Sequence, residues 1–264
     1  SFIHDFAISA NYCIFFQSAV QFNPLPYIFG FKGAGECVHF RPHLPTRIII
    51  VPRDPKAGKP VKVLSTKAGF VFHHTNAFEQ DGNIYLDSIC YDSLYQVKTN
   101  MDYREIDFDE LAPGQLWRFT LNLEEETVEQ QLLLSRCCEF PAVHPDKVGR
   151  PYRYAYLGGA HQELGNAPLQ GIVKVDTISG QSCFWSTAPD GFVSEPVFVP
   201  RPQAKTEDDG WILTMVYNGK KHRSEIVILD AANFEGGAIA RLPLKHHIPY
   251  GLHGNWTNEY FAQT

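Results

Sequence analysis

Short stretches in which apolar and polar residues alternate dominate this chain, and they predict β-strands from end to end. Residues 115–123 alternate well, and residues 127–134 form a second expected strand after three consecutive glutamates. The two segments therefore predict a hairpin. Asp81-Gly82 and Asn218-Gly219 are turn signals between further strands. The remaining expected strands are 47–53, 62–65, 70–72, 83–86, 152–157, 171–175, 182–186, 195–199, 211–217, 224–230 and a short one within 234–242. Strong helical periodicity is absent, so the pattern predicts an all-β barrel, sandwich or propeller.

Residues 5–31 form an apolar and aromatic stretch that interrupts this alternation. One interpretation is a core strand followed by a buried loop, and the other is an exposed apolar patch that meets a lipid or an apolar substrate. Pro24 and Pro26 are expected to rule out a regular helix or strand through that part. We expect some of the segment from Tyr12 to Phe31 to be exposed and to touch a membrane surface. The large apolar side chains concerned are Phe15, Phe16, Phe22, Tyr27, Ile28 and Phe29.

Composition sets the broad class of the protein. The chain has 264 residues, 44% of them hydrophobic and 13% aromatic, which suffices for a sizeable core and for a single domain over 1–264. A net charge of -6 without a run of five or more like charges gives no indication of nucleic-acid binding. None of the six cysteines forms a C-x-x-C pair, so we expect reduced thiols and a cytoplasmic protein.

The beginning of the chain and its apolar runs complete this picture. No apolar run reaches the roughly 18 residues of a membrane span. Residue 1 is Ser and the sequence continues directly into FIHDFAI, so we expect an N-terminally incomplete fragment of a longer protein, or a processed one.

Histidines and lone carboxylates beside apolar strands are the candidate chemical groups. His73 and His74 follow the apolar strand at 70–72, and only one of the two can point inward because neighbours in a strand face opposite sides. His253 stands in a glycine-bracketed segment, which lets the backbone come close to whatever the ring holds. Glu139 and Glu195 each lie among apolar strand residues, and a buried carboxylate needs a partner. A structural or surface histidine remains the alternative for each ring.

Six sequence blocks, in order along the whole chain, carry a resemblance to a known family. They are HDFAIS (4–9), FHHTNAFE (72–79), EFPAVHP (139–145), GRPYRYAY (149–156), SEPVFVPRP (194–202) and PYGLHGNW (249–256). Together they resemble the carotenoid cleavage oxygenases, and NPLPYIFGFKGAGE (23–36) is similar in texture to the bacterial apocarotenoid branch. Each block alone would be weak evidence for the family, whereas all six blocks together match it specifically.

The resemblance implies a seven-bladed β-propeller with Fe(2+) on its axis, held by four histidines. Three of those ligands would be His4, His73 and His253, with His73 preferred to His74 by its distance from the following asparagine. Glu139 and Glu195 match glutamates that hydrogen-bond the ligand rings, and they would face His73 and His253. The fourth histidine and one further glutamate would lie upstream of this chain.

The spacing of these five residues agrees with a propeller. Successive members of the series His4, His73, Glu139, Glu195 and His253 are separated by 56 to 69 residues. Each interval is about the length of one four-stranded blade, so the chain holds about four to five blades.

The family's chemistry adds O2 across a conjugated double bond of an apolar polyene, a carotenoid or apocarotenoid, and yields aldehydes. Phe2, Phe72 and Tyr91 are candidates for the wall of a substrate tunnel, with core packing as the alternative. Two other functions stay open: a relative that acts on a stilbene or isomerises a retinoid ester, and a propeller binding module without a catalytic metal. Because a partial ring exposes sheet edges, we expect these 264 residues alone to be inactive.

Overall fold

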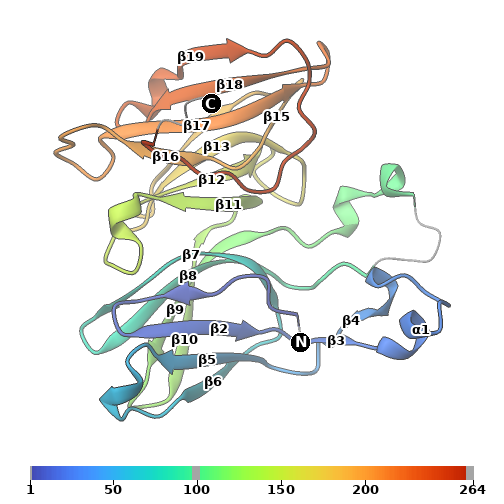
Figure 1. Cartoon of the computed structure of the whole chain (residues 1–264), viewed down its shortest axis with the longest axis vertical. Helices are drawn as coiled ribbons and strands as arrows, with labels where there is room; N and C mark the ends of the chain where they lie inside the picture. Colours follow the sequence, from blue (N-terminus) through green and yellow to red (C-terminus); the bar gives the residue numbers. More distant parts are fainter. Residues whose placement is uncertain (1, 97–101, 260–264) are drawn as a thin grey trace. The chain divides into compact units, whose positions relative to one another are not determined.

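A computed structural model describes residues 2–96 and 102–259 of the chain, and strands are its main regular secondary structure (Figure 1). The chain divides into two compact units. Unit 1 comprises Ser1–Cys138, Lys147–Pro151 and Gln162–Ala167, and unit 2 comprises Glu139–Asp146, Tyr152–His161 and Pro168–Thr264. The expectation of a single domain over 1–264 stays a prediction.

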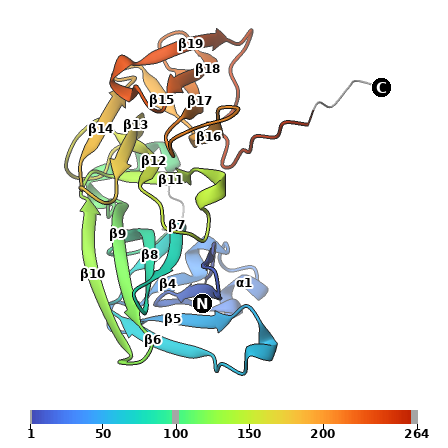
Figure 2. The same cartoon turned by 90° about the vertical axis from the view of Figure 1, so that its left-hand side faces the viewer.

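Unit 1 holds two antiparallel sheets, each built from strands that follow one another along the chain. The first has the order β1-β2-β5-β6. The second has the order β10-β9-β8-β7, which can be followed in Figure 2. The strands are β1 (Ala7–Ile8), β2 (Tyr12–Gln17), β5 (Thr46–Pro52), β6 (Lys62–Thr66), β7 (Phe70–Gln80), β8 (Asn83–Tyr91), β9 (Gln115–Asn122) and β10 (Thr127–Leu134). The expected hairpin turn at Asp81-Gly82 joins β7 to β8, with both residues at positive φ.

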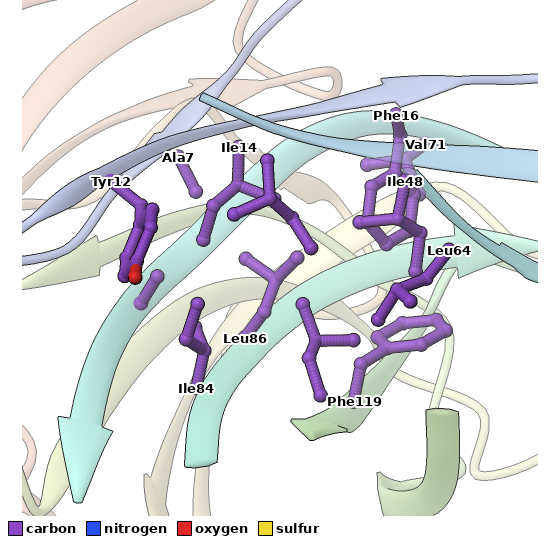
Figure 3. Close-up of a cluster of buried hydrophobic side chains, with 13 residues drawn as sticks. Ala7, Tyr12, Ile14, Phe16, Ile48, Leu64, Val71, Ile84, Leu86 and Phe119 are labelled. Carbon is purple, nitrogen blue, oxygen red and sulfur yellow. The ribbon is translucent and has the colours of Figure 1, made fainter. Parts of the chain in front are cut away.

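The two sheets of unit 1 share one apolar core. Ile14, Ile48 and Leu64 contribute from the first sheet, and Leu86 and Phe119 from the second (Figure 3). β2 shows how the sequence produces this core, because its residues are alternately buried and half-buried as the period of a strand requires.

An excursion between β2 and β5 carries the aromatic segment. It contains β3 (Val20–Phe22), α1 (Pro24–Ile28), η1 (Gly35–Cys37) and β4 (Val38–Phe40), and β3 pairs with β4. The expectation that Pro24 and Pro26 exclude a helix is wrong, because both lie in the first turn of α1, where an N–H has no helical partner. No residue of α1 is buried, so the buried-loop interpretation fails here, while Phe16 on β2 is buried, against the expectation of exposure.

A second excursion leads from β8 to β9 and contains η3 (Tyr103–Glu105) and η4 (Phe108–Glu110). This segment connects two strands of one sheet, because β8 and β9 are paired neighbours. The long connection therefore leaves the sheet and returns to it.

A short 3-10 turn, η2 (Pro55–Ala57), separates β5 from β6 in the first sheet.

Unit 2 repeats the architecture of unit 1. One sheet has the order β11-β12-β13-β14, and the other the order β15-β17-β18-β19 with β16 also paired to β17. The strands are β11 (Cys138–Val143), β12 (Tyr154–Ala160), β13 (Leu169–Asp176), β14 (Ser182–Ser186), β15 (Gly191–Val193), β16 (Val197–Pro200), β17 (Gly210–Asn218), β18 (Arg223–Asp230) and β19 (Ala238–Pro243), with η5 (Pro145–Lys147) and η6 (Phe234–Gly236) between them. Tyr156, Ile172, Phe198 and Ile212 belong to its apolar core.

The described part of the chain thus holds four antiparallel meanders of at least four strands each, the pattern of propeller blades. None of the six cysteines, all of which lie in the described ranges, forms a disulfide. Among the described residues, no helix has the length and apolar character needed to cross a bilayer.

Candidate metal centre

Two irregularities in β7 decide which way its histidines point. The pairing of β7 with β8 shifts between Val71 and His74, and again between His74 and Asn76. Such bulges place an extra residue outside the ladder and re-aim side chains. His73 falls within the first bulge, so it is released from the ladder while His74 remains paired with Ser88.

His73 and His4 face one another within unit 1. Their ring centroids are 4.9 Å apart and the rings are perpendicular, and a nitrogen of each lies within 4.8 Å of the other. His4 is exposed and His73 is half-buried. Two imidazoles so close and with different orientations can direct lone pairs toward a shared centre, as metal ligation requires.

His74 has a different environment from its neighbour. Its Nδ1 lies 2.7 Å from the Ser88 hydroxyl, and the Phe16 ring contacts it edge-on. Desolvation in the interior lowers the pKa of His74 to about 4, with a smaller contribution in the same direction from His73 and an opposing one from Asp5. This ring is therefore neutral at physiological pH and serves the packing of the sheet.

Asp5 joins the segment that carries His4 to the bulged part of β7. Its Oδ2 accepts the backbone N–H of His74 at 2.9 Å, and its Oδ1 accepts that of Phe6 at 2.7 Å. One carboxylate thus fixes the residue after His4 to the residue after His73. Sequence reasoning missed Asp5, although an acid directly after a candidate ligand is a readable signal.

Asn76 anchors the other side of the bulge. Its side-chain amide donates to the carbonyls of Lys147 and Arg150 at 2.9 and 3.1 Å, and its oxygen accepts the N–H of Gly149 at 2.9 Å. Asn76 is buried, and these three bonds use most of its capacity. The asparagine that serves as a sequence marker for His73 therefore also holds β7 in place.

In unit 2 a carboxylate holds His253 directly. Glu195 Oε1 lies 3.2 Å from His253 Nδ1, and Oε2 accepts the backbone N–H of Gly254 at 2.7 Å. Glu195 lies in the break between β15 and β16, where no ladder bond restrains it. A proton on Nδ1 directed at this carboxylate leaves the lone pair on Nε2, the tautomer that a metal ligand needs.

The segment that carries His253 is irregular and is fixed at further points. Ile248 N–H donates to the Ser224 hydroxyl at 2.9 Å, and the Tyr250 hydroxyl donates to the Val193 carbonyl at 2.8 Å. The Phe140 ring meets the His253 ring edge-on at 5.8 Å. We call residues 248–256 the C-terminal strap.

Glu139 lies on β11, and its Oε2 accepts the N–H of Phe140 at 2.6 Å. Phe140 has a φ of 55°, a left-handed conformation that is uncommon for a bulky residue.

The expected tunnel residues Phe2, Phe72 and Tyr91 belong to one aromatic cluster of unit 1. Phe72 contacts Tyr91 at 5.6 Å and His4 at 5.6 Å, both edge-on, so the cluster adjoins the His4–His73 pair.

Comparisons with known proteins agree with the resemblance. The apocarotenoid-15,15'-oxygenase of Synechocystis sp. is 60% identical over 256 residues, which cover 97% of this chain and 52% of that protein. The lignostilbene-α,β-dioxygenase isozyme III of Sphingomonas paucimobilis is 30% identical, over 97% of this chain and 54% of its own. The chain thus spans about half the length of the relatives that it matches.

Solved structures give the same result for the fold. The crystal structure of cobalt-substituted Synechocystis ACO matches with a TM-score of 0.94 and 60% identity, over 97% of this chain and 53% of that one. The predicted all-β, β-propeller fold class is thereby confirmed. The model of the family described as retinal pigment epithelial membrane protein matches residues 1–258. The chain belongs to this family, which is that of the carotenoid cleavage oxygenases.

Proposed function

We propose that this chain is part of a non-haem Fe(II) dioxygenase that cleaves a conjugated double bond of an apocarotenoid and releases aldehydes. The observation that carries the proposal is the 60% identity to a protein named for this activity, over nearly the whole chain. The identity to a stilbene-cleaving relative is half as large, so an apocarotenoid is the favoured substrate class.

His4, His73 and His253 supply three of the metal ligands in this proposal. The proximity of the His4 and His73 nitrogens supports it in unit 1, and the contact between Glu195 and His253 Nδ1 supports it in unit 2. Imidazole suits iron, zinc, copper or nickel, so the donor type fits the metal without selecting it. The choice of iron rests on the family resemblance. The family resemblance implies a fourth histidine and a third supporting glutamate, which would lie upstream of this chain.

Iron, when bound, supplies the binding and activation of O2, and the protein's groups arrange the reaction around it. Glu195 fixes the orientation of the His253 ring, and Glu139 has the corresponding task for His73. Such carboxylates make the imidazole a better donor and keep its lone pair directed at the metal. Phe2, Phe72 and Tyr91 offer apolar ring faces beside His4, which suits a flat polyene and excludes water.

The aromatic excursion of unit 1 is the proposed membrane contact, through which an apolar substrate would arrive. Its large apolar side chains are unusually exposed, from 47% for Phe22 to 81% for Phe31. Clusters of this kind on a soluble protein mark interaction sites. The other exposed members are Leu25, Tyr27, Ile28 and Phe29.

Liposome flotation tests the membrane contact in the full-length protein. Ile28→Ser with Phe31→Ser should reduce the bound fraction several-fold, because each removes apolar area that would enter the bilayer. Ile178→Ser is the matched control, since Ile178 is 75% exposed on unit 2. Equal flotation of both variants and the parent protein would argue against a membrane contact here.

Product analysis tests the enzymatic proposal. The iron-loaded full-length protein, given an apocarotenal in detergent, should form a shorter aldehyde in an iron-dependent way, and faster than it cleaves a lignostilbene. Isomerisation would change the substrate without releasing an aldehyde, and a binding module would retain no iron. The 264-residue segment alone should remain inactive even after iron loading.

A further inference from the structure

A small apolar cavity lies within unit 1, between the end of β6 and the second sheet. Its volume is about 30 Å³, and one side of it is open to solvent. Phe70, Val71, Trp117 and Phe119 form much of its wall, and Ala68 lies in the turn that leads from β6 into β7. Phe70 is 1% exposed and forms the inner wall, whereas the exposed side chains of Lys67 and Asp92 line the side that is open to solvent.

The polar side chains around the cavity are engaged with one another. Thr46 donates its hydroxyl proton to the Gly69 carbonyl at 3.1 Å, and Gln130 donates to the Thr66 hydroxyl. Lys67 pairs with Asp92 at 3.5 Å. A buried water needs two to four polar partners, whereas dry cavities lined by apolar groups bind small apolar molecules. The apolar part of the lining, formed by Phe70, Val71, Trp117 and Phe119, therefore suits a small apolar occupant.

The volume limits the size of that occupant. One water needs at least about 10–15 Å³ of such space, so the cavity accommodates a molecule of a few atoms. Pockets for drug-sized ligands measure roughly 300–1,000 Å³, which excludes a polyene. An apolar molecule of this size that the proposed reaction consumes is O2.

The cavity adjoins the aromatic cluster beside the histidine pair. Phe70, which forms its wall, contacts Phe72 at 4.5 Å between ring centroids, and Phe72 contacts His4 at 5.6 Å. Two phenylalanine rings, those of Phe70 and Phe72, thus separate the cavity from a proposed ligand. Rotation of aromatic rings in such a stack can pass a diatomic molecule.

We propose that this cavity is a docking site for O2 on its way to the metal centre, separate from the surface that takes the polyene. The inference rests on the proposed function, because only an oxygen-consuming enzyme needs such a site. It assigns Ala68 a place at the wall, where a larger side chain would fill the cavity.

Xenon is the probe, because it is apolar and visible in diffraction. Crystals of the full-length protein pressurised with xenon should show a peak bounded by Phe70, Val71 and Trp117. Ala68→Leu should abolish the peak and raise the KM for O2 several-fold, while kcat at saturating O2 and the KM for the apocarotenal stay unchanged. Ala57→Leu, in the η2 turn of the same unit, is the matched control and should keep both the peak and the KM.

Two results would overturn the proposal: an ordered water in the cavity in place of xenon, or a filled cavity in Ala68→Leu with an unchanged KM for O2. The xenon measurement on the parent protein does not depend on any variant folding. It also does not depend on turnover, so loss of the proposed enzymatic function would be recognised separately, by the absence of aldehyde from a protein that still binds xenon.

Discussion

The bulged segment of β7 and the C-terminal strap carry histidines with the same proposed task, but they position them by different means. In β7 the backbone sets the position of the ring. Two bulges release His73 from the ladder, and Asn76 fixes the strand three residues further along. The strap has no ladder, and Glu195 must hold both the His253 ring and the next backbone N–H. A ligand on a strand thus depends on register, and a ligand on an irregular segment depends on one side chain.

The largest expected effect separates the two adjacent histidines of β7. In the full-length protein, His73→Ala should lose iron and activity to background, because a proposed ligand is gone. His74→Phe should keep the iron and lose about 1–3 kcal/mol of stability, since the buried Ser88 hydroxyl loses its partner. Metal analysis and urea unfolding measure the two outcomes. Equal loss of iron in both variants would mean that the bulge does not distinguish the two rings.

The second prediction concerns acid stability of the metal-free full-length protein. The pKa of His74 is about 4 in the folded state and 6.5 without its environment. As the pH falls below 6.5 the unfolded chain takes up this proton first, so the free energy of unfolding should fall by up to about 3 kcal/mol between these values and change little above 6.5. Urea unfolding across this pH range measures the slope, and His74→Phe should flatten it. An unchanged slope in that variant would assign the acid sensitivity to other groups.

The strap should respond most to Glu195. A glutamine there cannot accept from both His253 Nδ1 and Gly254, so Glu195→Gln should weaken iron retention roughly 10–100-fold, and we expect the same range for Glu139→Gln. Glu207→Gln is the matched control in unit 2, because Glu207 also accepts backbone N–H groups, at 2.7 and 2.8 Å, from Arg153 and Tyr154. Iron analysis after dialysis should separate them. If all three variants kept iron equally, the carboxylates would be purely structural.

The smallest effect is expected at Asp5, where a side chain assists the backbone. Asp5→Asn keeps one acceptor oxygen and loses the other, so one of the bonds to His74 N–H and Phe6 N–H weakens, at a cost of about 1 kcal/mol. Iron affinity should fall only a few-fold. Asp54→Asn is the control, since Asp54 caps an exposed turn of the same unit. A loss of iron as complete as in His73→Ala would show that the strand pairing of β7 is not enough, and that the Asp5 carboxylate is needed to keep His4 beside His73.

Much of the fold could be predicted because strand alternation and turn residues are local signals. The hairpin at Asp81-Gly82 and the strands β10 (127–134) and β14 (182–186) lie where the sequence places them. The short helix at Pro24 was missed because proline is tolerated in a first turn. The exposure of the same segment follows from tertiary packing, which no local pattern reports.

The candidate site was harder to predict than the strands around it. The sequence identifies histidines beside strand ends, but the choice between His73 and His74 rests on bulges in the pairing with β8, a strand that follows the hairpin. The contribution of Asn76 depends on a loop more than seventy residues later. Alternation cannot reveal such long-range partners, and the family resemblance supplied the choice instead.

The left-handed backbone of Phe140 implies a conflict between durability and chemistry at that position. A non-glycine residue pays about 1–2 kcal/mol in this conformation, and glycine would pay little. Under laboratory evolution for heat resistance alone, position 140 should therefore drift toward Gly or Asn. Under selection for turnover the aromatic ring should persist, because it packs edge-on against His253 beside Glu139. The two selections would therefore favour different residues at position 140. The residue recovered from a screen for both properties would show which selection was stronger.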